Sequence, residues 1–255
     1  LYTAYTGMIN EQNRMDIMTN NLANASTVGY KKEGSTSQSF DDVLTVKIKD
    51  QSVGMRNVQR LGVKNPGVKI GENYTDYSQG SFRITGNTYD LALSGEGFFA
   101  IEFTNKAGET DTKYTRAGQF TLNKDGYLVT EEGDYVLDTQ NRRIRLNTLI
   151  DSSITDDGTI YQNGQAVAKI QVTDFEDYDY LEKYGETYYQ PIQGAKTIAA
   201  KAQVKSGYLE MANVQIVSEM VNLISITRAY ESNQKVVQTI DDTLDVAVNQ
   251  IGRVQ

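Results

Sequence analysis

The feature that most constrains the fold is a heptad pattern close to the C-terminus. Its positions alternate in steps of three and four over three heptads: Tyr230, Asn233, Val237, Ile240, Leu244, Ala247 and Ile251. An apolar seam of this kind is buried only against a partner helix. The sequence therefore predicts a long C-terminal helix that pairs with another helix.

The residues just upstream extend this helix and widen its apolar face. One stripe contains Val214, Val217, Val221 and Ile224, and a second contains Ile216, Met220, Leu223 and Ile226. Two stripes provide enough apolar surface for two neighbouring helices. From Val214 to Ile251 the helix would be roughly 57 Å long at about 1.5 Å per residue, which few compact domains need.

A second helical stripe lies at the N-terminus and ends abruptly. Its positions are Leu1, Tyr5, Met8, Gln12, Met15, Thr19 and Leu22. The stretch NNLANASTVGYKK, residues 20–32, follows it. Asparagine tolerates the left-handed conformation, so Asn20, Asn21 and Asn24 are expected to end the helix, and Gly29 lets the backbone turn. Lys31 and Lys32 are expected beyond the helix end, where the helix dipole favours cations.

The residues between the two helices have a β pattern. Asp125-Gly126, Asp157-Gly158 and Asn163-Gly164 separate alternating segments and predict three hairpins in an antiparallel meander from about Gly80 to Val204. Residues 33–75 are rich in Gly, Ser and Asn and predict an extended connector with short strands.

The expected fold class is therefore α+β, with terminal heptad helices that pair as a coiled-coil module and a central antiparallel β-rich domain. The expected parts are an N-terminal helix at 1–32, the connector at 33–75, the β-rich domain at 76–206 and a C-terminal helix at 207–255.

The composition excludes several classes of function. The 255 residues include 25 Lys and Arg against 33 Asp and Glu, and the net charge of −8 argues against nucleic acid as a partner. The chain has no cysteine and no histidine, which excludes disulfides, thiolate nucleophiles and histidine-dependent catalysis. Enzymes that use carboxylates, lysines or tyrosines remain compatible. No run of 18 apolar residues occurs, so we expect no membrane insertion.

Local motifs for ligands are weak. SGEGFF, with Gly95 and Gly97, has Phe98 and Phe99 where a phosphate loop needs a third glycine and a helix, and it favours a tight turn into a buried strand. TDFEDYDYLEKY supplies carboxylates but lacks the glycine of a calcium loop. We expect no catalytic residue, no metal site and no cofactor.

Three long blocks resemble the bacterial flagellar axial proteins. NNLANASTVGYKK resembles their N-terminal signature, GNTYDLALSGEGFFAIE with YTRAGQFTLNKDGYLVTEEGDYVL resembles their central β block, and GYLEMANVQIVSEMVNLISITRAYESNQKVVQTIDDTL resembles their C-terminal helix. Together the blocks cover about half of the chain, in the family's order. Hook proteins resemble this chain at both ends but carry much larger outer domains. A chain of 255 residues with one β domain is instead similar to the basal-body rod proteins. The segment 33–75 contains Pro66 but lacks the proline-rich run of distal rod proteins, and 139–150 lacks the prolines expected there. The proximal and distal rod therefore both remain open.

The resemblance implies a structural role without catalysis. It implies a subunit that forms a homo-oligomer in a helical assembly, contacts other flagellar rod and hook proteins, transmits torque, and leaves through the flagellar export apparatus without a cleaved signal peptide. The first residues, LYTAYTGMINEQNR, lack the pattern of a secretory signal. The alternatives are a hook-type axial subunit or a secreted β-domain protein that binds or cleaves cell-wall glycan.

The sites implied are an assembly surface and a sequence motif. The motif residues are Asn20, Asn21, Asn24, Thr27, Gly29 and Tyr30. The assembly residues are Leu1, Tyr5, Met8, Met15, Leu22, Val217, Val221, Ile224, Tyr230, Val237, Ile240, Leu244 and Ile251.

Overall fold

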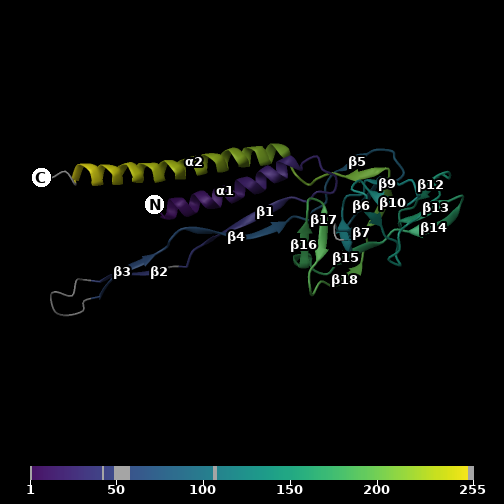
Figure 1. The fold of residues 1–255 in the computed structure, drawn as a ribbon, viewed down its shortest axis with the longest axis horizontal. Coiled ribbons are helices and arrows are strands. Elements are labelled where there is room, and N and C mark those ends of the chain that lie inside the picture. The colour runs from purple at the N-terminus through teal and green to yellow at the C-terminus, as the bar shows by residue number, and fades with distance from the viewer. Residues whose placement is uncertain (1, 42, 49–57, 106–107, 252–255) are drawn as a thin grey trace. The chain divides into compact units, whose positions relative to one another are not determined.

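The computed structural model describes residues 2–41, 43–48, 58–105 and 108–251. The chain divides into two compact units. The helical unit comprises Leu1–Leu22, Glu33–Asp76 and Gln215–Gln255, and the β unit comprises Ala23–Lys32 and Tyr77–Val214. Figure 1 shows the helices and the sheets that make up these units. The expected α+β class is confirmed, whereas the domain boundaries expected at residues 33, 76 and 207 stay predictions.

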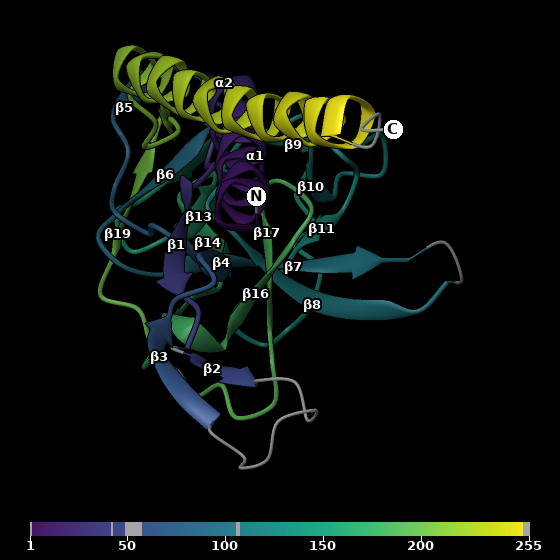
Figure 2. The same ribbon diagram turned by 90° about the vertical axis from the view of Figure 1, so that its left-hand side faces the viewer.

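Two helices pair in the helical unit. Helix α1 spans Tyr2–Ala23, and α2 spans Ile216–Val246 and continues into a π-helical turn, η2, at Ala247–Ile251. They lie side by side in Figures 1 and 2. A Cβ atom added at Gly7 would lie 3.1 Å from Asn233 Nδ2, so a larger residue at position 7 would crowd α2. The predicted pairing of the terminal helices is confirmed.

The segment Glu33–Asp76 of the helical unit contains two antiparallel strand pairs. Strand β1 (Glu33–Ser39) pairs with β4 (Val68–Thr75), and β2 (Val43–Ile48) pairs with β3 (Val58–Lys64). Ser37 Oγ donates a 3.0 Å hydrogen bond to Asn10 Oδ1 of α1. Short strands were expected in this connector, but their mutual pairing was not.

The main sheet of the β unit is antiparallel. The strand order is β16-β17-β8-β7-β11-β10-β9, and β15 pairs with both β7 and β18. The strands are β7 (Phe98–Thr104), β8 (Thr110–Thr115), β9 (Phe120–Leu122), β10 (Leu128–Thr130), β11 (Tyr135–Val136), β15 (Val172–Phe175), β16 (Leu181–Tyr184), β17 (Tyr188–Pro191) and β18 (Thr197–Ala199), with a 3₁₀ turn, η1, at Tyr178–Tyr180.

Smaller sheets complete the unit and break the expected meander order. Strands β12 (Ser152–Ile154), β13 (Thr159–Gln162) and β14 (Gln165–Lys169) form one sheet. Late strands return to early ones: β19 (Gln203–Ser206) pairs with β6 (Leu91–Ser94), and β20 (Tyr208–Glu210) pairs with β5 (Phe82–Ile84). The prediction of a simple meander is wrong in this respect, because these pairings join segments that are distant in the sequence.

The three predicted hairpins are confirmed. They connect β9 to β10, β12 to β13, and β13 to β14. Gly126 and Gly158 each have a φ of 81°, and the Asn163-Gly164 pair has φ values of 52° and 75°. Such positive φ values are the reason that Asn-Gly and Asp-Gly pairs identify these turns.

The core of the β unit consists of two clusters on opposite faces of β7. Phe99 packs with Leu91, Phe120 and Leu128, whereas Phe98 packs in a second cluster that includes Tyr189. Both phenylalanines are fully buried, and successive side chains of a strand point to opposite faces. The predicted tight turn into a buried strand at SGEGFF is confirmed.

Candidate functional site

The junction segment, residues 23–32, leaves α1 and packs against the last strand of the β unit. Val28 forms an antiparallel bridge with Met211, and Gly29 N donates a 2.8 Å hydrogen bond to Glu210 O. Gly29 has a φ of 70°, and a Cβ atom there would lie 2.2 Å from Ala117 N. Position 29 therefore requires glycine for two reasons: its backbone is left-handed, and the loop between β8 and β9 approaches it closely at Ala117.

A buried ion pair fixes the end of the junction segment. Lys31 Nζ lies 2.7 Å from Glu210 Oε1 and donates a 2.7 Å hydrogen bond to Ser78 O. The other carboxylate oxygen of Glu210 accepts a 3.3 Å bond from Arg116 Nη1, and Gly80 N donates a 2.9 Å bond to Oε1. Lys31, Arg116 and Glu210 are at most 3% exposed.

Lys31 lies beyond the end of α1, as the sequence predicts, but it is buried and its charge is paired with a glutamate. Its charge is balanced inside the β unit by Glu210, which the sequence reasoning missed together with Arg116. The one available signal was the sequence Tyr-Leu-Glu at 208–210, where a carboxylate directly follows a buried leucine at the end of a β-type segment. An isolated charge of this kind is normally exposed, because burial without a partner is unfavourable.

The asparagines of the motif act through their side chains. Asn21 is fully buried; its Nδ2 donates a 2.8 Å bond to Glu33 O, and its Oδ1 accepts a 2.9 Å bond from Glu33 N. Neither Asn20, Asn21 nor Asn24 has a positive φ, so the expected left-handed conformation is wrong for these residues. Asn21 instead holds the start of β1 against the last turn of α1, and Asn20 is half-buried beside it.

The remaining motif residues bind within the β unit. Asn24 Nδ2 donates a 2.9 Å bond to Glu186 Oε2, and Thr27 Oγ1 donates a 3.1 Å bond to Asn24 Oδ1. Tyr30 is fully buried, with Lys183 Nζ 4.3 Å from its ring centre. The structure thus places Asn24, Thr27, Gly29 and Tyr30 together in the β unit and Asn21 in the helical unit.

The assembly residues expected on α1 are only partly covered. Tyr5 is 50% exposed, whereas Met8, Met15 and Leu22 are half-buried. Leu1 lies outside the described residues. Among the described residues of α1, the buried side chains are Asn10, Ile17 and Asn21. Asn10 and Ile17 follow Met8 and Met15, respectively, by two positions, so the buried side chains lie on the opposite side of the helix from the expected stripe.

The assembly residues expected on α2 fall into two groups. Tyr230, Val237 and Ile240 are half-buried, and Leu244 is 53% exposed. The upstream stripe is the most exposed, with Val217 at 76%, Val221 at 57% and Ile224 at 55%. Ile251 is the last residue of η2. Apolar residues that are also exposed but lie outside the expected set are Tyr2, Ile9, Ile216, Met220, Val236, Val246 and Val248.

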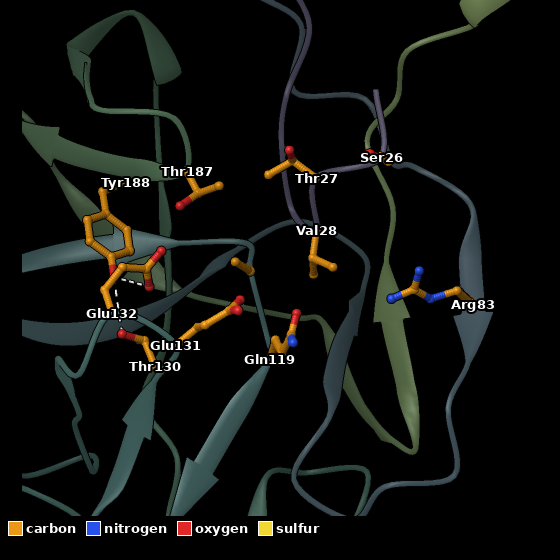
Figure 3. Close-up of a pocket in the computed structure, with 11 residues that line it drawn as sticks. Ser26, Thr27, Val28, Arg83, Gln119, Thr130, Glu131, Glu132, Thr187 and Tyr188 are labelled. Atoms are coloured by element: carbon orange, nitrogen blue, oxygen red, sulfur yellow. Dashed lines mark hydrogen bonds between the residues drawn. The ribbon is translucent and has the colours of Figure 1, made fainter. Parts of the chain in front are cut away.

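A cavity of about 330 Å³ lies in the β unit beside the junction segment (Figure 3). Thr27 and Val28 line one side, and Glu131, Glu132 and Tyr188 line another. In the part of the chain that the structure describes, acidic side chains form no group arranged to hold a metal ion. Likewise, neither α1 nor α2 is apolar enough over its described length to span a membrane.

Comparison with protein families identifies three matching segments. Residues 1–31 match the family described as flagella basal body rod protein, residues 92–164 match the flagellar hook protein FlgE/F/G D1 domain, and residues 205–251 match the flagellar basal body rod FlgEFG protein C-terminal family. These segments contain α1, residues 23–31 of the junction segment, strands β7 to β13 and α2. The matches therefore cover the elements that form both helices and their connection to the sheets.

Individual relatives match over nearly the whole chain. The flagellar basal-body rod protein FlgG of Bacillus subtilis is 34% identical over 98% of this chain and 97% of its own length. FlgF of Caulobacter vibrioides is 32% identical over 100% and 98%, and the flagellar hook-basal body complex protein FlhO of Bacillus subtilis is 30% identical over 100% and 98%. The chain belongs to the flagellar basal-body rod protein family and is a structural subunit of the rod.

Proposed function

We propose that the chain polymerises with copies of itself, and with other rod and hook proteins, through the apolar faces of α1 and α2. The observation that carries this proposal is the exposed stripe of Val217, Val221 and Ile224 on a helix that already has α1 as a neighbour. Exposed apolar side chains in register on one helix face are typical of an interaction surface.

The energetics favour burial of this stripe between subunits. Fully burying one Val or Ile side chain contributes about 1.5–3 kcal/mol. Ordering a long helix costs roughly 1–2 kcal/mol per residue of backbone entropy, so a lone helix with little buried surface is marginal. Contacts repeated along both helices by neighbouring subunits offset this cost, which makes helix order and assembly mutually dependent.

The proposal is tested by Val221→Asp with Asn222→Asp as the matched control. Both positions are exposed on the same turn of α2, and both variants introduce the same charge. We expect Val221→Asp to abolish polymer formation in sedimentation and electron microscopy, whereas Asn222→Asp retains it. The control variant should also restore motility to a strain that lacks the protein. Normal polymerisation by Val221→Asp contradicts a role for the stripe.

A related prediction concerns the heptad positions further along α2. Val237→Asp or Leu244→Asp should block assembly without unfolding the β unit, because each places a charge among apolar side chains. The half-buried Val237 should be the more sensitive of the two. Circular dichroism of the variants separates loss of assembly from loss of the fold.

We also propose that the chain reaches the rod through the flagellar export apparatus, without a cleaved signal peptide. Membership of the rod family supports this route, because the resemblance to the flagellar axial proteins implies export through the flagellar apparatus. Deletion of residues 1–40 should abolish secretion from a motile host, while the intact chain is secreted at its original length. Unchanged secretion after the deletion contradicts the proposed route.

A further inference from the structure

The hydroxyl group of Tyr188 lies among three polar side chains at the edge of the cavity. Its Oη atom is 2.9 Å from Glu132 Oε2, 2.9 Å from Asp134 Oδ2 and 3.2 Å from Thr130 Oγ1. Figure 3 shows Tyr188 pointing toward Glu132 and Thr130. Tyr188 comes from β17, whereas the other three residues come from β10 and the turn that follows it.

These contacts need one more proton than the side chains carry in their usual ionisation states. A tyrosine hydroxyl donates one hydrogen bond and accepts two, and an ionised carboxylate only accepts. Tyr188 therefore satisfies one of the two carboxylates. Glu132 and Asp134 each lie 2.9 Å from Tyr188 Oη. If both were ionised, the carboxylate that does not accept the Tyr188 proton would face a lone pair of that oxygen.

The surroundings indicate which carboxyl group keeps the proton. Asp134 is half-buried and Glu132 is exposed. Burial raises the pKa of Asp134, and the charge of Glu132 adds to this, whereas hydrogen bonds from Tyr188 and the Thr104 backbone and the charge of Lys113 act in the opposite direction.

The other charged groups around the hydroxyl leave the Tyr188 proton in place. Burial raises the pKa of Tyr188 well above its usual range, and the nearby carboxylates of Glu132 and Asp134 contribute. Lys113 comes from β8, where Asp111 faces it, and Glu131 lies on the turn beside Glu132. Arg83 is on the opposite wall of the cavity.

We propose that Asp134 holds a proton that it donates to Tyr188 Oη, that Tyr188 donates its own proton to Glu132, and that this chain latches the turn at 131–134 to β17. Thr130 Oγ1 donates to the remaining lone pair of Tyr188 Oη and accepts the 3.2 Å bond from Asp134 N. The Tyr188 hydroxyl then uses its donor and both of its acceptors, which the doubly ionised state does not allow.

The latch borders the junction segment. Glu186 accepts the hydrogen bond from Asn24, and Thr187 and Tyr188 line the same cavity as Thr27 and Val28. Because the pKa of Asp134 is raised in the folded chain, the latch is complete at low pH and is lost as the pH rises through that pKa. Ionisation of Asp134 therefore loosens the wall that faces the junction segment.

The test is a carboxyl ¹³C NMR titration of the full chain under dilute conditions. Asp134 should titrate above the usual aspartate range, and Glu132→Gln should lower its midpoint by roughly one pH unit, because it removes the negative charge that attracts the Tyr188 proton and disfavours ionisation of Asp134. Glu131→Gln removes an adjacent charge without touching the hydroxyl and should cause a smaller shift. Equal shifts in the two variants, or an ordinary midpoint for Asp134, overturn the proposed proton chain.

Backbone amide NMR signals report on the latch itself. The signals of Gly133 and Thr187 should change with the same midpoint as Asp134. In Asp134→Asn they should be insensitive to pH in that range, because the side-chain amide of the asparagine donates a hydrogen bond at every pH. If Thr187 does not respond while Asp134 titrates, the proton chain does not act as a latch. The ¹H–¹⁵N spectrum of each variant reports whether the β unit has kept its fold.

Discussion

Lys31 Nζ and Glu210 Oε1 lie 2.7 Å apart, although 179 positions separate the two residues in the chain. Lys31 lies in the junction segment and Glu210 in β20, so the contact closes the β unit with residues from both of its sequence ends. Because Arg116 and Gly80 also bind Glu210, this carboxylate joins four segments of the unit.

Removing the lysine should destabilise the β unit strongly. In Lys31→Met the Glu210 carboxylate keeps Arg116 but loses its shorter contact, and breaking a buried pair typically costs about 3–5 kcal/mol. Chemical denaturation of the full chain measures the loss. Lys124→Met makes the same substitution at an exposed position and should change the free energy of unfolding by less than about 0.5 kcal/mol. Similar losses in both variants contradict a structural role for the pair.

Gly29→Ala should destabilise the β unit more than the same substitution at another glycine with a positive φ. Gly29 and Gly164 have φ values of 70° and 75°, but only at Gly29 does an added Cβ atom meet backbone, at 2.2 Å from Ala117 N. Gly164→Ala should therefore show only the backbone strain, about 1 kcal/mol, and Gly29→Ala should exceed it severalfold or prevent docking of the junction segment. Thermal unfolding of both variants compares the two costs, and equal melting temperatures contradict the expected crowding.

Limited proteolysis should yield a core that keeps the junction segment. Residues 23–32 and 207–214 belong to the β unit. We therefore expect the stable fragment to begin within α1 or at its end and to finish near Val214. Mass spectrometry of the fragments identifies their ends. A stable core that lacks Lys31 or Glu210 contradicts the assignment of residues 23–32 and 207–214 to the β unit.

The two helices of a dilute subunit should exchange their amide hydrogens quickly. On α1 only Asn10, Ile17 and Asn21 are buried, and on α2 only Glu219 and Ile226, among the residues described. Helices with so little buried surface open readily. Hydrogen exchange measured by mass spectrometry should show low protection in both helices at low concentration and high protection after polymerisation. Full protection in the monomer favours a self-contained fold.

The helices and hairpins could be predicted from the sequence because the patterns that indicate them lie within each element. The steps of three and four in residues 1–22 and 214–251 predict helices, and the Asp-Gly and Asn-Gly pairs identify three turns through their backbone requirements. The pairing of β19 with β6 and of β20 with β5 left no such local signal. Long-range strand order depends on which faces bury which side chains, and that depends on the complete fold.

The motif residues were found by resemblance, but their physical roles were not. Asn21 was expected to end a helix by its backbone, whereas it binds the backbone of Glu33 through both polar atoms of its side chain. The partner of Lys31 could not be inferred, because a single glutamate near the other end of the sequence carries no mark of the residue it will meet.

The division of the chain has a mechanical consequence. The backbone passes between the helical unit and the β unit at residues 22–23, 32–33, 76–77 and 214–215, which makes four covalent connections. A force that acts on the helical unit therefore has four covalent routes into the β unit, and cutting any one of them leaves three.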